Sequence, residues 1–304
     1  MQKGQITKAL SGFYYVTDDS NMIYQTRARG VFRKQKITPL VGDYVEFESG
    51  SKEEGVIQNL LERKNELVRP QVANVDIGII IMSAADPKFS NQLLDRFLVM
   101  LESKHIKPVI FITKMDLLST DESMEIKKYQ KDYNAIGYQM ILIEKTDKDK
   151  KEQLETLFSE QFKNNLIVFM GQSGAGKSTL LNVLNPELEL KTGETSQSLG
   201  RGKHTTRHVE LVPLLDSLIA DTPGFSLLAF DEIEQESLSE YFPEMWSLRS
   251  DCRFSGCLHL NEPGCAVKKA VLEGEIPEYR YNNYQLFLEE IKKRKPRYRK
   301  KGES

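Results

Sequence analysis

The chain has 304 residues, of which 39% are hydrophobic and 28% charged, a composition typical of a globular protein with two or three domains. The longest apolar run is far short of the roughly 20 residues that cross a bilayer, and the N-terminus lacks the apolar segment of a signal peptide. We therefore expect a cytoplasmic protein with no membrane partner. The net charge is −2, but residues 291–304 alone carry +7, which indicates either an anionic partner or a solvated tail.

Residues 1–70 have the pattern of a small β-domain. Short segments rich in β-branched and aromatic residues, at 4–8, 12–16, 22–26, 41–47 and from 55 onward, are separated by turn formers. Five short strands in this length predict an OB-fold barrel. Basic residues lie between the strands at Arg27, Arg29, Arg33, Lys34 and Lys36. They favour an RNA-binding domain, with scattered surface charge as the alternative.

Residues 71–230 change to an alternation of apolar strands and amphipathic helices. Nearly continuous apolar runs at 75–82, 108–112, 138–143 and 166–170 predict buried parallel strands. Leucine and phenylalanine residues between 93 and 101, and between 154 and 158, have helical spacing. The alternation predicts a doubly wound α/β domain with helices on both faces of the sheet.

A complete phosphate-loop motif follows the last of these strands. It consists of Gly171, Gln172, Ser173, Gly174, Ala175, Gly176, Lys177 and Ser178, and Thr179 continues into a helix. The glycines let backbone N–H groups converge on a phosphate at a helix N-terminus. We expect Lys177 to contact the β- and γ-phosphates and to take part in catalysis, and Ser178 to bind Mg²⁺.

The segment Thr113-Lys114-Met115-Asp116 has the form of a guanine-recognition motif and follows a buried strand. A carboxylate at Asp116 can accept hydrogen bonds from N1–H and the exocyclic amine of guanine, a donor pair that adenine lacks. The motif therefore favours GTP and GDP. A transporter-type ATPase is the less favoured alternative, because the strand that ends at Asp221 is followed by Thr222 and not by a second, catalytic acidic residue.

Two further segments resemble GTPase switches. Asp221-Thr222-Pro223-Gly224 follows an apolar strand, and we expect Asp221 near Mg²⁺ and Gly224 near the γ-phosphate. Thr205 and Thr206 provide hydroxyls for the γ-phosphate and Mg²⁺. Phe225 stands where a water-orienting glutamine is usual, so His204 is the catalytic candidate. The alternative is that His204 orders its loop or contacts RNA.

The motifs have an unusual order, because Asp116 precedes Lys177 although GTPases ordinarily place the phosphate loop first. The sequence thus predicts a circularly permuted P-loop GTPase, an arrangement that folds tolerate when the original termini lie close together. The second switch then leads directly into the C-terminal region.

The C-terminal region, residues 231–304, holds every cysteine of the chain. Cys252, Cys257, His259 and Cys265 offer three thiolates and one imidazole, a set typical of a structural Zn²⁺ site. Aromatic residues from Tyr279 onward predict an amphipathic helix before the basic tail. Their spacing is more typical of packing than of RNA stacking. We expect a zinc-binding, mainly helical domain.

Taken together, these motifs resemble the ribosome small-subunit-dependent GTPase A family. Besides the segments above, the likeness includes Val72-Ala73-Asn74-Val75-Asp76, Asp95-Arg96-Phe97-Leu98 and the residues from Gly202 to Arg207. The resemblance implies a monomeric GTPase that is stimulated by the 30S subunit, binds 16S rRNA and acts in late 30S maturation. A nucleotide-gated rRNA-binding factor remains the alternative. Two positions depart from the family pattern. Thr113 replaces a commoner asparagine, and Glu144-Lys145-Thr146 occupies the place of the motif that usually contacts the guanine O6.

Overall fold

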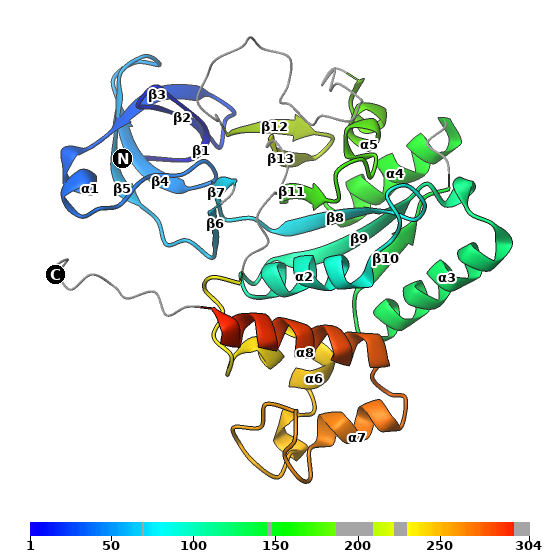
Figure 1. The fold of residues 1–304 in the computed structure, drawn as a ribbon. Coiled ribbons are helices and arrows are strands. Elements are labelled where there is room, and N and C mark those ends of the chain that lie inside the picture. Colours follow the sequence, from blue (N-terminus) through cyan, green and yellow to red (C-terminus); the bar gives the residue numbers. More distant parts are fainter. Residues whose placement is uncertain (69, 145–147, 187–208, 222–229, 295–304) are drawn as a thin grey trace. The chain divides into compact units, whose positions relative to one another are not determined.

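The computed structural model describes residues 1–68, 70–144, 148–186, 209–221 and 230–294 (Figure 1). The chain packs as two compact units. The first unit comprises Met1–Phe89 and Lys104–Leu227, and the second comprises Ser90–Ser103 and Leu228–Ser304. Within the described ranges, no helix is both long and apolar enough to cross a membrane.

The N-terminal strands close into a five-stranded barrel. They are β1 (Gln2–Leu10), β2 (Phe13–Asp18), β3 (Ile23–Ala28), β4 (Tyr44–Ser49) and β5 (Gly55–Leu60). The barrel order is β1-β2-β3-β5-β4, with β4 pairing back to β1, and a short helix, α1 (Gly30–Lys34), separates β3 from β4. Alternate side chains such as Ile6, Val16 and Phe47 fill its interior. The predicted OB-fold barrel is confirmed.

The chain segment between the barrel and the next sheet makes several polar contacts. Strands β6 (Glu66–Val68) and β7 (Gln71–Ala73) form a two-stranded sheet. Asn74, in the left-handed region at φ 58°, donates its side-chain amide to the Gly42 carbonyl at 3.0 Å. A Cβ at Gly42 would lie 2.1 Å from the Ala73 carbonyl, so this close approach requires glycine. The carboxylate of Asp76 accepts from the Leu166 N–H at 2.7 Å, which joins this segment to the sheet that follows.

That sheet contains β8 (Ile77–Ser83), β9 (Lys107–Thr113), β10 (Gln139–Leu142), β11 (Leu166–Gly171), β12 (Glu210–Leu214) and β13 (Ser217–Asp221). Their order is β10-β9-β8-β11-β13-β12, parallel except for the antiparallel pair β12–β13. All seven residues of β8 are buried, as the continuous apolar run predicted. The α/β fold is confirmed.

Three helices accompany this sheet: α3 (Thr120–Ala135), α4 (Lys148–Gln161) and α5 (Lys177–Leu184). Leu154 and Phe158 of α4 pack with Leu180 and Leu181 of α5 in one apolar core. Helix α3 was not predicted from the sequence, and its only buried residues are Ile126 and Tyr133. A capping box between Ser119 and Glu122 begins it.

The second unit is mainly helical. It contains α2 (Asn91–Glu102), η3 (Leu238–Tyr241), α6 (Pro243–Trp246), η4 (Arg249–Asp251), α7 (Ala266–Leu272) and α8 (Glu278–Lys293). Helix α8 buries Tyr284, Phe287 and Ile291, so the predicted amphipathic helix is confirmed and these side chains serve packing. Helix α2 packs into this unit, although the strands before and after it belong to the first unit.

A buried ion cluster lies within the second unit. Arg280 is completely buried and donates to Asp95 of α2 at 2.5 Å and to Glu244 of α6 at 2.7 Å. Asn283 adds a hydrogen bond to Asp95 at 2.6 Å. The Arg280 guanidinium also lies 4.6 Å from the centroid of the Phe242 ring. The cluster thus joins three helices that are distant in the sequence.

Candidate functional site

The predicted nucleotide-binding segments follow the carboxyl ends of three parallel strands of the sheet. The base-recognition segment begins where β9 ends, the phosphate loop where β11 ends, and Asp221 is the last residue of β13. Strand β8 lies between β9 and β11, and its Ile81 is in register with both Phe111 and Gly171. The carboxyl ends of parallel strands are the usual place for ligands in open α/β sheets.

The phosphate loop curls through three glycines with positive φ: Gly171 at 142°, Gly174 at 77° and Gly176 at 87°. A Cβ on Gly171 would lie 1.9 Å from the Ile81 carbonyl oxygen, so the loop can leave the strand here only with glycine. Gly176 is the N-cap of α5, and its carbonyl accepts from Leu180 N at 2.9 Å. The loop therefore presents the start of a helix, where backbone N–H groups favour an anion.

The remaining predicted phosphate-loop residues lie around that helix start. Lys177 and Ser178 are the first residues of α5 and are half-buried, whereas Ser173 and Thr179 are exposed. Ala175 is buried in the core beside Leu180 and Leu181. The Gln172 N–H donates to Ile81 O at 3.2 Å, which fixes the loop to β8.

The base-recognition segment turns sharply after β9. Lys114 adopts a left-handed conformation at φ 59°, and its ammonium donates to the carbonyl of Asp86. Met115 is buried, and Asp116 is exposed in the 3₁₀ turn η1 (Met115–Leu117). The Met115 N–H points to Ile143 O at 3.4 Å, so the chain after β10 lies against this turn. The exposed carboxylate of Asp116 is therefore available to accept hydrogen bonds from a purine base.

One hydroxyl connects the two segments. Thr113 Oγ1 donates to the Ala175 carbonyl of the phosphate loop at 2.6 Å and lies 3.3 Å from Met82 O. Thr113 is buried, so this bond is shielded from water. A threonine in place of the commoner asparagine therefore still joins base recognition to phosphate recognition. The Asp86 and Ala175 carbonyls were not foreseen, because any residue type supplies such an acceptor.

Several predicted site residues lie outside the described part of the chain. They are His204, Thr205, Thr206 and Gly224, together with Phe225. Asp221 is placed as the last residue of β13, but its side chain is not described. Of Glu144-Lys145-Thr146, only Glu144 is described, and it is exposed directly after Ile143.

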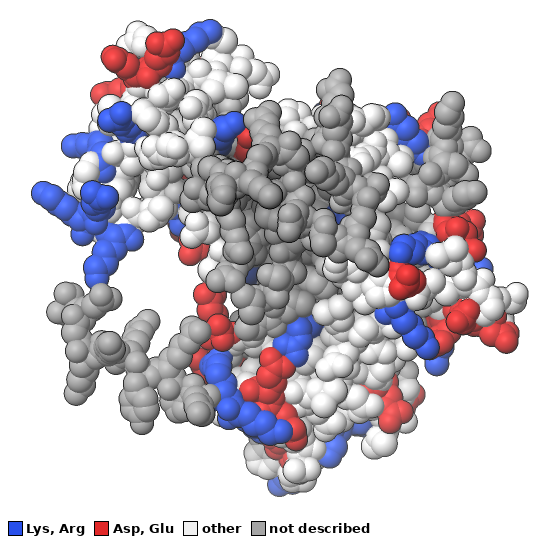
Figure 2. Space-filling view, turned by 45° about the horizontal axis from the view of Figure 1, so that its top comes forward, with Lys and Arg blue, Asp and Glu red and all other residues white. Residues whose placement is uncertain are grey.

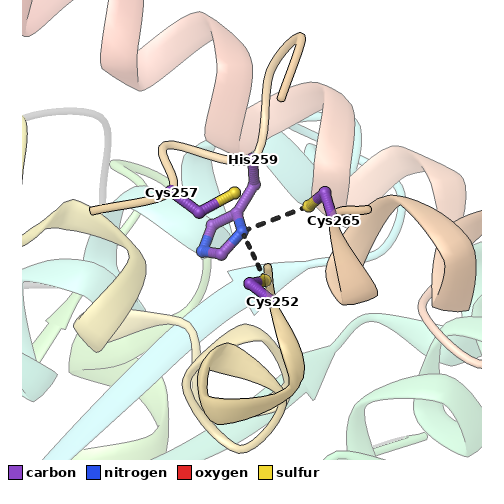
Figure 3. A group of neighbouring side chains, drawn as sticks. All are labelled: Cys252, Cys257, His259 and Cys265. Carbon is purple, nitrogen blue, oxygen red and sulfur yellow. Dashed lines mark hydrogen bonds between the residues drawn. The ribbon is translucent and has the colours of Figure 1, made fainter. Parts of the chain in front are cut away.

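The four predicted metal ligands come together in the second unit (Figure 3). One ligand atom from each of Cys252, Cys257, His259 and Cys265 lies within 4.8 Å of all the others. His259 Nδ1 is 3.7 Å from Cys252 Sγ and 3.4 Å from Cys265 Sγ. These distances bracket the roughly 3.5 Å between sulfur and nitrogen ligands in a tetrahedral Zn²⁺ site. The cluster could therefore hold a metal ion.

The chain around the cluster holds these ligands in place. His259 is buried in the left-handed region at φ 59°, and its carbonyl accepts from the Tyr281 hydroxyl at 2.6 Å. The Glu262 carboxylate accepts from two backbone N–H groups of the same loop, those of Leu258 and Leu260. Burial raises the pKa of the Cys257 thiol to about 12, with the neighbouring Cys265 sulfur adding to the rise. A cation would lower it, because metal ligands bind as thiolates.

Comparison with known proteins agrees with this arrangement. Residues 60–231 match the family described as RsgA GTPase, and residues 3–57 match the RsgA N-terminal domain. A protein of Geobacillus sp. (strain WCH70), named small ribosomal subunit biogenesis GTPase RsgA, is 55% identical over 298 residues, covering 98% of this chain and all of that protein. The protein of the same name from Bacillus subtilis (strain 168) is 52% identical over 302 residues, with the same coverage.

Solved structures show the same fold. The crystal structure of YloQ, described as a circularly permuted GTPase, superposes with a TM-score of 0.83 at 47% identity, over 98% of this chain and 97% of that one. YjeQ from Thermotoga maritima gives a TM-score of 0.82 at 33% identity, over 97% of this chain and 99% of that one. The predicted circular permutation is confirmed.

Proposed function

The chain belongs to the RsgA GTPase family, and from this premise we propose that it hydrolyses GTP to GDP on the small ribosomal subunit, late in the maturation of that subunit. Relatives named small ribosomal subunit biogenesis GTPases are matched along their whole length. Acting there, the protein contacts 16S rRNA, works as a monomer and resides in the cytoplasm.

The observation that carries this proposal is the joining of a base-recognition segment to a phosphate loop. Thr113 binds the phosphate loop directly, while Asp116, three residues later in the chain, is exposed and available for the base. In our assignment Asp116 accepts from the two donors of guanine, and Lys114 packs along the purine. Lys177 contacts the β- and γ-phosphates from the start of α5.

Hydrolysis needs a Mg²⁺ ion, which neutralises the charge that develops on the phosphate oxygens. We assign the Ser178 and Thr206 hydroxyls as its ligands, with Asp221 in its outer shell. The position of Asp221 at the end of β13, beside β11, supports this assignment. Thr205 and Gly224 would bind the γ-phosphate.

His204 is our candidate for the group that orients the attacking water, because Phe225 cannot form that hydrogen bond. The expected result for His204→Ala is unchanged GTP affinity with loss of the turnover that small subunits stimulate. Measuring both on the full chain tests the assignment. An unchanged stimulated kcat would assign His204 to loop structure or RNA contact instead.

We propose that the metal of the Cys₃His cluster is one structural Zn²⁺ ion. The support is the donor set, since three sulfurs and one imidazole in tetrahedral reach suit zinc. Elemental analysis of the purified chain, with Cys265→Ser as the comparison, tests this. One zinc per wild-type chain and its loss in the variant are expected, and a chain that folds and binds no zinc would contradict the assignment.

The barrel is the proposed site of rRNA contact in the N-terminal part, residues 1–70. Residues 20–42 contain five basic side chains and no acidic one. Arg27, Arg29, Arg33, Lys34 and Lys36 are exposed on and around α1, and Figure 2 shows Lys and Arg side chains gathered over this part of the barrel. Such a surface suits RNA phosphates, and its binding should weaken as salt rises. The basic tail, residues 291–304, would add to it.

Sedimentation with purified ribosomal subunits tests the proposed partner. The full chain, loaded with a non-hydrolysable GTP analogue, is expected to sediment with small subunits and much less with large ones. Loading with GDP should reduce the bound fraction. Equal binding to both subunits, or binding that ignores the nucleotide, would contradict the proposal.

A further inference from the structure

Strand β1 belongs to two sheets, because it leaves the barrel partway along its length. Residues Gln2–Gln5 pair with β4 and close the barrel, whereas Lys8 is in register with Glu210 of β12. The register against β2 skips Thr7 between these two parts of the strand. Thr7 is therefore the extra residue of a β-bulge, a feature that bends a strand. The second half of β1 thus reaches the sheet that carries the predicted nucleotide-binding segments.

An ion pair reinforces this meeting of β1 and β12. Lys8 Nζ lies 3.0 Å from Glu210 Oε1 and 2.9 Å from Glu210 Oε2. The two side chains are 28% and 44% exposed, and an ion pair with this exposure contributes little to the overall stability of a domain. The importance of the pair therefore depends on what it holds in place.

Glu210 lies at the end of a hairpin that leads into both predicted switches. It is the first residue of β12, shortly after Thr205 and Thr206, and it is in register with Asp221, the last residue of β13. Lys8, Glu210 and Asp221 therefore form one row across three neighbouring strands. Residues of like charge directly opposite each other in an antiparallel pair are destabilising. Lys8 supplies a positive charge to this row from the third strand.

The two ends of this hairpin are held differently. At its turn, the buried hydroxyl of Ser217 donates to the Phe162 carbonyl at 2.7 Å. The Asn164 N–H donates to the Asp216 carbonyl there, also at 2.7 Å. The pairing of β13 with β11 lies near the same turn, at residues 218–219.

At the switch end, the polar contact that the structure describes for Glu210 from outside the hairpin comes from Lys8. This contact is partly open to water, in contrast to the buried hydrogen bond of Ser217. The ends of β12 and β13 that lead to the switches are therefore the part of the hairpin that depends on Lys8.

We propose that Lys8 is a positioning residue for Mg²⁺-dependent GTP hydrolysis, and that it holds the switch end of the β12–β13 hairpin through Glu210. The start of β12 fixes where the segment that contains Thr206 rejoins the sheet, and the end of β13 fixes the position of Asp221. This inference rests on the proposed function, because that function assigns Thr206 and Asp221 to the Mg²⁺ site.

Amide hydrogen exchange of the nucleotide-free chain tests the holding role directly. Lys8→Met removes the charge and keeps most of the length of the side chain. It should speed exchange at the switch end of the hairpin, residues 210–212 and 219–221, because this end opens locally more often. Exchange at the turn end, residues 213–218, should stay unchanged. Equal exchange in both proteins, or an equal increase at both ends of the hairpin, would overturn the proposal.

The Mg²⁺ requirement tests the consequence for the nucleotide site. Release of a fluorescent GDP analogue and unstimulated GTP turnover are measured over a range of Mg²⁺ concentrations. Lys8→Met should raise the Mg²⁺ concentration that gives half-maximal retention of the nucleotide by about two- to fivefold, the range of a partly exposed ion pair. Lys8→Arg should restore the wild-type requirement. A requirement in Lys8→Met equal to that of the wild type would sink the idea.

Two further variants locate the effect. Adding Glu210→Gln to Lys8→Met should shift the Mg²⁺ requirement no further than Lys8→Met alone, because the two residues act as a pair. Lys3→Met is the matched control, since Lys3 lies on the same strand and pairs with Glu46 within the barrel at 3.9 Å. It should leave both the Mg²⁺ requirement and the exchange of the hairpin unchanged. Additive shifts, or an equal shift in Lys3→Met, would contradict a specific role of Lys8.

The wild-type chain separates this inference from the proposed function. If it hydrolyses no GTP, or hydrolyses GTP without Mg²⁺, the proposed function fails and the inference fails with it. If the wild-type chain requires Mg²⁺ and Lys8→Met is indistinguishable from it, only the inference fails. A raised Mg²⁺ requirement in Lys8→Met, with recovery in Lys8→Arg, is the expected result.

Discussion

Replacing Arg280 by alanine should destabilise the second unit severely. Arg280 is completely buried, and the side chains of its partners Asp95 and Glu244 are 0% and 6% exposed. Its removal deletes three hydrogen bonds of 2.5–3.1 Å and takes away the guanidinium that pairs with two buried carboxylates. Breaking a buried ion pair from one side costs about 3–5 kcal/mol. That is a large part of the roughly 5–15 kcal/mol by which a domain is stable.

Urea unfolding followed by Trp246 fluorescence measures this effect, because the only tryptophan lies in the second unit. Lys293→Ala on the same helix is the control, since its ion pair with Glu289 is largely exposed and should contribute no more than about 0.5 kcal/mol. A loss below about 1 kcal/mol in Arg280→Ala would refute the view that this cluster holds α2, α6 and α8 together.

Three further predictions concern the sites. Thr113→Val should weaken GTP and GDP binding about tenfold, because the Ala175 carbonyl loses its buried donor, and Thr113→Ser should retain affinity in a fluorescent-nucleotide titration. Gly171→Ala should cost about 2 kcal/mol or more of stability in thermal unfolding, since its Cβ would overlap the Ile81 carbonyl, whereas Gly50→Ala has open space and should be neutral. Removing the metal with a chelator should lower the melting temperature of the second unit and leave nucleotide affinity intact. A chelator that lowered both the melting temperature and the nucleotide affinity would contradict the view that the metal stabilises the second unit alone.

The strands and the phosphate loop were predictable because their signals are local. A continuous apolar run such as that of β8 has few interpretations, and the glycines of the phosphate loop are required by the backbone that they form. Asp116 after β9 and Lys177 after β11 then follow from strand order. Helix α3 was not predictable in this way, because only two of its side chains are buried and two residues do not form a recognisable apolar stripe.

Long-range polar contacts were not predictable in this way. In the sequence, Arg280 looks like an ordinary charged residue of an amphipathic helix. Its partner Asp95 is 185 residues away, and no local pattern indicates that the two side chains pair. The packing of α2 with the second unit depends on the same contacts.

Nucleotide turnover with and without ribosomal subunits tests the central claim most directly. The full chain is assayed with GTP and with ATP at equal concentration, in the presence of small subunits, large subunits or neither. Recognition of guanine by Asp116 predicts turnover of GTP only, and the proposed function predicts strong stimulation by small subunits alone. Equal use of ATP would contradict the guanine assignment, and GTP turnover that small subunits leave unchanged would contradict the proposed role on the ribosome.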